Sequence, residues 1–155
     1  MVPAVPHFSA AYEVDRPIAE VFEWHRDTRN AAAISPPSLL VEQVEGRFPV
    51  EQGDRVRLVV HQRGNPIRQR WLVRIAELRS PTLIVDEMLE GPFARWRHEH
   101  CFRDLGGVRT RVTDRVTWAL PLGLHVVAGP IAGRLLSATF AHRQRRSRDL
   151  LEAGR

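Results

Sequence analysis

The feature that most constrains this chain is a run of six strand-like segments between residues 39 and 120, with one long helical segment after it. Apolar and polar residues alternate along the segments, and Gly or Pro stands at every junction. The segments are 39–45, 55–62, 67–78, 82–89, 95–103 and 109–120. Parallel strands need a crossover of a dozen or more residues, and these junctions are too short for one. We therefore predict an antiparallel meander.

The residues before the meander predict one more strand, 7–14, and two short helices, the first capped by Asp15 and the second over 27–33. After the meander the chain is predicted to be helical, most clearly over 131–152. The predicted fold class is α+β: a seven-stranded antiparallel sheet wrapped on a long C-terminal helix. A helix about 10 Å wide cannot cover so broad a concave face, so a cavity or bulky side chains must occupy the rest.

Length and composition predict a single domain over residues 1–155. The one cysteine, Cys101, excludes an internal disulfide and a cysteine-built zinc site. The first residues lack the basic start and apolar run of a signal peptide, and the longest apolar stretch, 119–140, is interrupted by Pro, His and Arg. A cytoplasmic protein without a membrane span is expected.

All 23 basic residues are arginines, and the net charge of +5 combines −4 over residues 1–53 with +9 over 54–155. A basic C-terminal part could attract nucleic acid or anionic lipid, whereas an arginine-rich codon usage would produce the same composition without any such partner. Four arginines gather near the end of the predicted helix: Arg143, Arg145, Arg146 and Arg148. We expect them to face solvent and to complement the helix dipole.

The two strands 95–103 and 109–120 place polar residues on an otherwise apolar face. Alternation turns His98 and His100 inward between aromatic residues, and it turns Asp114 inward on the neighbouring strand. A three-residue loop at Gly106-Gly107 would set His100 opposite Asp114, and a slip of two residues would set His98 there instead. An inward carboxylate must be paired or hydrogen-bonded in either register.

This His–Asp contact has three open interpretations: a polar spot in a ligand pocket, a satisfied structural pair, or an acid/base pair with Asp114 orienting His100. The HxH pattern also places two metal-ligand types on one face, with Asp114 as a possible third ligand. Because HxH alone is a weak signal, no metal is expected. No phosphate-binding glycine motif or nucleophile elbow occurs in the sequence, so no cofactor is expected either.

Two stretches carry a family resemblance. The segment 14–22 (VDRPIAEVF) and the stretch 86–116, with its patterns EGPF, WxHxHxF and RTxVxDxV, are similar to uncharacterised bacterial members of the SRPBCC superfamily. The resemblance implies a START-like helix-grip fold with a deep hydrophobic cavity between the sheet and the C-terminal helix. Relatives include lipid carriers, coenzyme Q-binding proteins, hormone-binding proteins and polyketide cyclases, so the resemblance is specific for fold and not for function.

The prediction is a cofactor-independent protein, monomer or homodimer, that binds a hydrophobic or aromatic small molecule in this cavity. The alternative is a polyketide cyclase- or dehydratase-like enzyme that uses His100 and Asp114 as acid/base. A third class, an arginine-rich binder of nucleic acid or anionic membrane, rests on charge alone. The sequence does not decide whether Asp86 or Glu87 points inward, because both faces of strand 82–89 are equally apolar. The predicted ligand-binding residues are Trp71, Val73, Trp96, His98, His100, Phe102, Asp114, Val116 and Trp118.

Overall fold

The computed structural model describes residues 5–154; residues 1–4, which carry part of the signal-peptide argument, and residue 155 lie outside the described part. The elements are β1 (His7–Val14), α1 (Ile18–Arg26), α2 (Asn30–Ile34), β2 (Leu39–Glu45), β3 (Arg55–Gln62), β4 (Gln69–Arg79), β5 (Leu83–Glu90), β6 (Arg95–Asp104), β7 (Thr110–Ala119), a 3₁₀ turn (Pro121–Gly123) and α3 (His125–Ala153). The predicted α+β class is confirmed.

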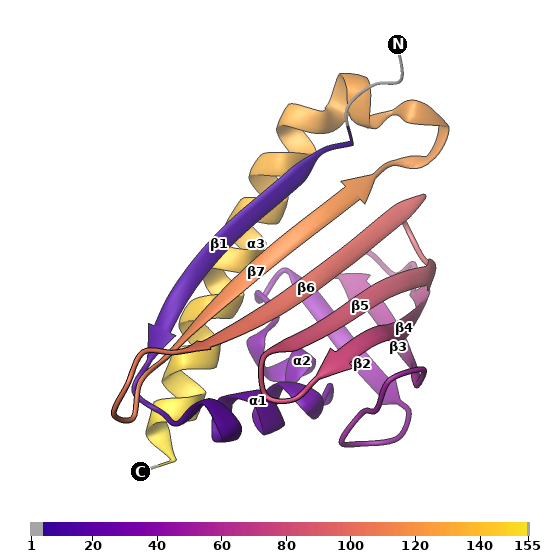
Figure 1. The fold of residues 1–155 in the computed structure, drawn as a ribbon. Helices are drawn as coiled ribbons and strands as arrows, with labels where there is room; N and C mark the ends of the chain where they lie inside the picture. The colour runs from indigo at the N-terminus through magenta and orange to yellow at the C-terminus, as the bar shows by residue number, and fades with distance from the viewer. Residues whose placement is uncertain (1–4, 155) are drawn as a thin grey trace.

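The seven strands form one antiparallel sheet in the order β1-β7-β6-β5-β4-β3-β2. Strands β2 to β7 are a meander, in which each strand pairs with the next along the chain. Strand β1 instead pairs with β7, and His7 lies opposite Thr117. Helix α3 runs along the sheet beside β1 and β7, and α1 and α2 lie near the C-terminal end of α3 (Figure 1). The helices therefore cover the concave face of the sheet at two places, α3 beside β1 and β7 and the α1–α2 pair near the C-terminal end of α3.

Two apolar clusters hold these layers together. In the larger one, Phe22 of α1 meets Phe102 of β6 edge to face, with ring centroids 5.5 Å apart. In the smaller one, Phe140 of α3 packs with Val116 and Trp118 of β7. Burial of such side chains stabilises a fold by roughly 1.5–3 kcal/mol each. The two clusters together pack α1 and α3 against the same face of the sheet.

Helix starts are the main correction to the predicted elements. Asp15 does not cap α1: the N-cap is Pro17, which has no side-chain cap bond. The Asp15 carboxylate accepts a hydrogen bond from Arg109, and the backbone N–H of Asp15 donates to the Glu152 carboxylate at the end of α3. Helix α3 begins at His125, six residues before residue 131, where the prediction was clearest. It continues through Pro130 without a break. Asp15 thus joins three separate segments of the chain.

The first turns of α3 are poorly covered. Large apolar side chains there are exposed, namely Leu124, Val126, Val127, Ile131 and Leu135. Within residues 5–154, no helix combines the length and apolar character that a bilayer span requires. The buried part of α3 is its second half, where Phe140, Gln144, Ser147 and Leu151 face the sheet.

Candidate functional site

A cavity of about 410 Å³ lies between the concave face of the sheet and α3. Its wall is mostly apolar, with side chains from β3, β4, β5 and β6 on one side and from α3 on the other. Its apolar wall includes Trp71, Val73, Met88, Phe93, Leu136 and Phe140. A volume in this range is typical of small-molecule sites, which span roughly 300–1,000 Å³.

The structure brings five of the nine predicted ligand-binding residues to this wall, and four lie elsewhere. The five are Trp71, Val73, Trp96, His98 and His100. The four residues outside the wall are Phe102, Asp114, Val116 and Trp118, all of which are buried. The prediction placed the whole inward face of β6 and β7 in the pocket. Helix α1 covers Phe102 and helix α3 covers β7, so that part of the face is core.

Of the two β6–β7 registers that the sequence left open, the structure has the one with a three-residue loop at Gly106-Gly107. The N–H of Leu105 donates to the carbonyl of Arg109 over 3.0 Å, and His100 lies opposite Asp114. Both imidazoles nevertheless reach the same carboxylate. His98 Nε2 donates to Asp114 Oδ1 at 2.8 Å, and His100 Nδ1 lies 3.2 Å from the same oxygen. Asp114 thus sits behind the two histidines rather than in the cavity.

Asp86, whose phase the sequence left open, points inward from β5 opposite His98. Its Oδ2 lies 3.3 Å from His98 Nδ1 and accepts a hydrogen bond from His100 Nε2 at 3.3 Å. Trp96 Nε1 donates to its other oxygen at 3.3 Å. Two imidazoles therefore lie between two carboxylates, one at the cavity wall and one behind it. Glu87 is on the opposite face, paired with Arg74 and Arg97.

The charges of this cluster depend on one another. Burial acts to raise the pKa of Asp114, but hydrogen bonds from His100 and His98 outweigh it and hold the pKa well below its usual range. Burial likewise opposes the low pKa of Asp86, which the two histidines nevertheless hold below its usual range. Burial acts to lower the pKa of His100, but its hydrogen bonds to Asp114 and Asp86 raise it to about 9. Both carboxylates are therefore ionised at neutral pH.

Helices α1 and α3 each add a basic side chain to the cavity wall. His25 lies with its ring 5.6 Å from that of His100, and burial, with the nearby charge of His100, lowers the pKa of His25 to about 3. Arg143 is half-buried, lines the cavity, and lies over the Phe140 ring, 5.7 Å from its centroid. The expectation that Arg143 faces solvent is therefore wrong. Its neighbours Arg145, Arg146 and Arg148 are exposed, as predicted.

Gln144 connects α3 to the cluster. Its side chain is buried, and its Nε2 donates to Asp114 Oδ2 at 2.7 Å. With His98 on Oδ1, both oxygens of the buried carboxylate are satisfied. Because Gln144 and Arg143 are adjacent on the helix, the same turn of α3 supports the cluster from behind and contributes a cation to the cavity wall.

Among residues 5–154, one group of side chains has the spacing of metal ligands: Asp86, His98 and His100, whose ligand atoms lie within 4.8 Å of one another. The sequence prediction considered Asp114 as the third ligand of a HxH site. Asp114 faces the outer nitrogens of both rings instead, and Asp86 faces the inner ones.

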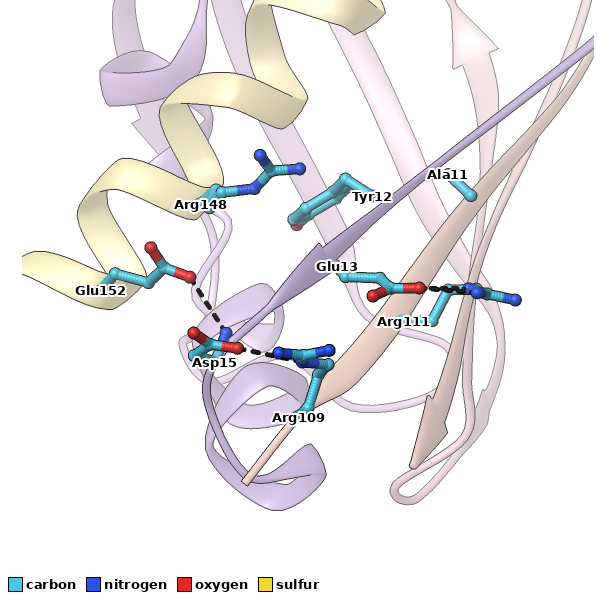
Figure 2. A pocket seen from close by; sticks show the side chains of 8 residues that line it. All are labelled: Ala11, Tyr12, Glu13, Asp15, Arg109, Arg111, Arg148 and Glu152. Carbon is cyan, nitrogen blue, oxygen red and sulfur yellow. Dashed lines mark hydrogen bonds and ion pairs between the residues drawn. The ribbon is translucent and has the colours of Figure 1, made fainter. Parts of the chain in front are cut away.

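A second hollow lies at the surface, where β1 meets the end of α3 (Figure 2). Its charged side chains are largely paired with one another: Arg111 with Glu13 at 2.6 Å and Arg109 with Asp15 at 3.1 Å. Figure 2 shows Glu13 on β1 beside Arg111 on β7, Asp15 and Arg109 just outside these strands, and Arg148 and Glu152 on the helix opposite. Such paired surface charges have little left with which to recognise a ligand.

Several wall residues escaped the sequence prediction. Asp86 and Met88 lie on a strand whose two faces are equally apolar, so periodicity gave no phase. Leu136 and Arg143 are seven residues apart on α3 and share its cavity face, which the apolar stripe alone did not separate from the arginine-rich face. The signal available in advance was this seven-residue spacing, together with Phe140 between them.

Comparison with known proteins agrees with the geometry. The family described as polyketide cyclase / dehydrase and lipid transport matches residues 14–143. No curated protein sequence matches the chain at a significant level.

Similar solved structures cover almost the whole chain. The protein TTHA0849 from Thermus thermophilus has a TM-score of 0.75 at 20% identity, covering 96% of this chain and 99% of that one. The ZhuI aromatase/cyclase from Streptomyces sp. R1128 has 0.70 at 23%, covering 96% and 92%. A START superfamily protein from Mycobacterium smegmatis has 0.73 at 14%, covering 96% and 99%. At these identities the likeness shows a shared fold.

Proposed function

The chain belongs to the polyketide cyclase / dehydrase and lipid transport family, and we propose that it binds a small hydrophobic or aromatic molecule between its sheet and α3. The observation that carries the proposal is the cavity of about 410 Å³, with apolar walls and a few polar groups gathered in one part of it. Ligand sites commonly combine an apolar lining with a few polar groups that orient the ligand. The proposal treats residues 1–155 as a single START-like domain acting in the cytoplasm.

The polar part of the wall suggests how such a ligand would be oriented. His98 and His100 come from β6, Asp86 from β5, and Arg143 faces them from α3. Trp71, Val73 and Leu136 supply apolar wall. A ligand with an apolar body and one polar end would bury its body against the aromatic and aliphatic side chains and direct its polar end to the histidines. A lipid or a fused aromatic compound has this form.

Helix α3 offers a matched pair of variants to test the cavity. Leu136 lines it, whereas the adjacent Leu135 is exposed. The probe N-phenyl-1-naphthylamine is titrated into wild type, Leu136→Trp and Leu135→Trp. We expect wild type and Leu135→Trp to bind alike and Leu136→Trp, which fills the cavity, to bind at least about tenfold more weakly. Equal binding by the two variants would place the probe elsewhere and contradict the proposal. Native mass spectrometry of protein purified from its own host would then identify the ligand.

A cyclase- or dehydratase-like activity is the second candidate, favoured by two imidazoles at the cavity wall with a carboxylate behind them. Such an arrangement orients an imidazole for proton transfer. His100 would exchange the proton with the substrate, and Asp114 would act as a positioning residue, since it does not reach the cavity. The test is turnover of a β-hydroxyketone or poly-β-ketone probe. Turnover lost in His100→Gln with binding retained supports the enzyme, and binding without turnover supports the carrier.

A further inference from the structure

Three side chains at the cavity wall have ligand atoms that converge on one point. Asp86 on β5 is the cross-strand partner of His98 on β6, and His100 is two residues further along the same face of β6. The side chains are partly or fully buried, and their ligand atoms lie within 4.8 Å of one another. Two rigid neighbouring strands therefore present two imidazole nitrogens and one carboxylate oxygen to the cavity.

Two of the three distances between the ligand atoms match those around a small divalent ion, and the third is at most 4.8 Å. Asp86 Oδ2 lies 3.3 Å from His98 Nδ1 and 3.3 Å from His100 Nε2. A tetrahedral ion with bonds of about 2.0–2.1 Å holds its neighbouring ligand atoms about 3.3–3.4 Å apart. An ion could thus be accommodated with small movements of the side chains.

The outer nitrogen of His98 is held as in metal centres. His98 Nε2 donates to Asp114 Oδ1 at 2.8 Å, whereas His100 Nδ1 lies 3.2 Å from the same oxygen without forming a hydrogen bond. Gln144 donates to Asp114 Oδ2 and fixes the carboxylate. Histidines that bind metals commonly donate their other ring nitrogen to such a carboxylate, which sets the tautomer and the ring orientation. This tautomer leaves the lone pair of His98 Nδ1 facing Asp86.

The cluster is built to hold positive charge. Asp86 and Asp114 contribute two negative charges, and Arg143 and the protonated His100 contribute positive ones, so a metal ion would take the place of the proton on His100. A lone pair on an imidazole nitrogen and a carboxylate oxygen facing each other require a proton or a metal ion between them. We propose that Asp86, His98 and His100 bind a divalent transition-metal ion, such as Zn²⁺, with an open coordination position toward the cavity. Two imidazoles and a carboxylate suit Zn²⁺, Co²⁺ and Fe²⁺.

A bound ion here would overturn the expectation of no metal, which rested on HxH alone being a weak signal. The structure supplies Asp86 as the third ligand and assigns Asp114 a supporting position. The metal proposal does not depend on the proposed hydrophobic ligand, because metal binding is measured on the protein alone.

The experiment is a titration of chelator-treated protein with Zn²⁺ by calorimetry and with Co²⁺ by visible absorption. We expect one ion per wild-type chain, and loss of that binding in Asp86→Asn and His98→Gln. Asp114→Asn, which removes only the carboxylate behind the rings, should weaken binding by about 10–100-fold. The matched control is His61→Gln: His61 lines the same cavity but pairs with Glu42 at 3.0 Å, away from the cluster, and should bind like wild type.

Two results would overturn the proposal: no stoichiometric binding by wild type, which leaves protons alone between the groups, or undiminished binding in both Asp86→Asn and His98→Gln. X-ray absorption of the Zn²⁺-loaded wild type gives an answer even if the variants fold poorly. Two imidazole ligands in that spectrum support the site. A sulfur ligand, which Cys101 would supply, or oxygen ligands only, would contradict it.

Discussion

His98 donates a hydrogen bond of 2.8 Å to Asp114, although the strand register places His100, not His98, opposite that carboxylate. The contact runs diagonally across β6 and β7, where side chains two residues out of register are still within reach of each other. One carboxylate thereby holds two imidazoles, and Gln144 ties it to α3. The sheet and the helix thus meet at a polar contact within an apolar interior.

Removing the charge of Asp114 and removing its polarity should have different effects on stability. Asp114→Leu leaves His98 and Gln144 without a buried acceptor, and breaking a buried ion pair from one side costs about 3–5 kcal/mol. Asp114→Asn keeps an acceptor oxygen and should cost clearly less. Urea denaturation measures both. Thr113→Leu, on the opposite face of β7, is the control and should stay within about 0.5 kcal/mol of wild type. Equal losses in Asp114→Leu and Asp114→Asn would contradict the role of the hydrogen bonds.

The arginines of α3 should separate into two kinds. Arg145 and Arg146 are exposed, so replacing both with Gln should leave the melting temperature nearly unchanged, within about 0.5 kcal/mol of stability per residue. Arg143→Gln removes a cation from the cavity wall and should weaken the binding of an anionic apolar probe. Thermal melts and a titration with 8-anilinonaphthalene-1-sulfonate test the two expectations. A large loss of stability in the double variant, or unchanged probe affinity in Arg143→Gln, would show that this division is wrong.

Thr110 at the start of β7 is fully buried, and its hydroxyl donates to the carbonyl of Arg16 over 2.8 Å. Thr110→Val keeps the shape but leaves that carbonyl without its donor, so we expect a loss of about 1–3 kcal/mol. Thr117→Val, on the outer face of the same strand, should have little effect. Chemical denaturation of the two variants makes the comparison. A harmless Thr110→Val would mean that water replaces the hydroxyl.

Leu122 is 97% exposed and has a φ of 56°, the left-handed region that a branched side chain disfavours. Leu122→Gly should therefore stabilise the protein by up to about 1 kcal/mol. Leu124, two residues later, has a φ of −58° at the start of α3, and Leu124→Gly should give no such gain. Differential scanning calorimetry reads both. Equal shifts in the two variants would rule out backbone strain at Leu122 as the cause.

Sequence periodicity predicted the sheet well because each strand of the meander carries its own alternation. A three-residue loop at Gly106-Gly107 gives the observed pairing of His100 with Asp114, but a two-residue slip also keeps the apolar faces together, so the sequence left both registers open. Asp86 was not assignable, because Leu83, Ile84 and Val85 are all buried and the strand has no polar face in that part. Which side chains line a cavity depends on where the helices pack, and a local sequence pattern does not contain that information. For this reason Phe102 lies in the core and not at the cavity, whereas Arg143 lines the cavity.

The position of β1 has a consequence for how the chain assembles. Strands β2 to β7 each pair with their neighbour in sequence, so their hairpins can form one after another by closing short loops. The pairing of β1 with β7 joins residues about a hundred positions apart, and loop-closure entropy makes such a contact slow to form. We therefore expect β1 to join an already formed meander as a late step of folding, so that kinetic data on the refolding chain would show the protection of β1 amides lagging behind that of β4 and β5.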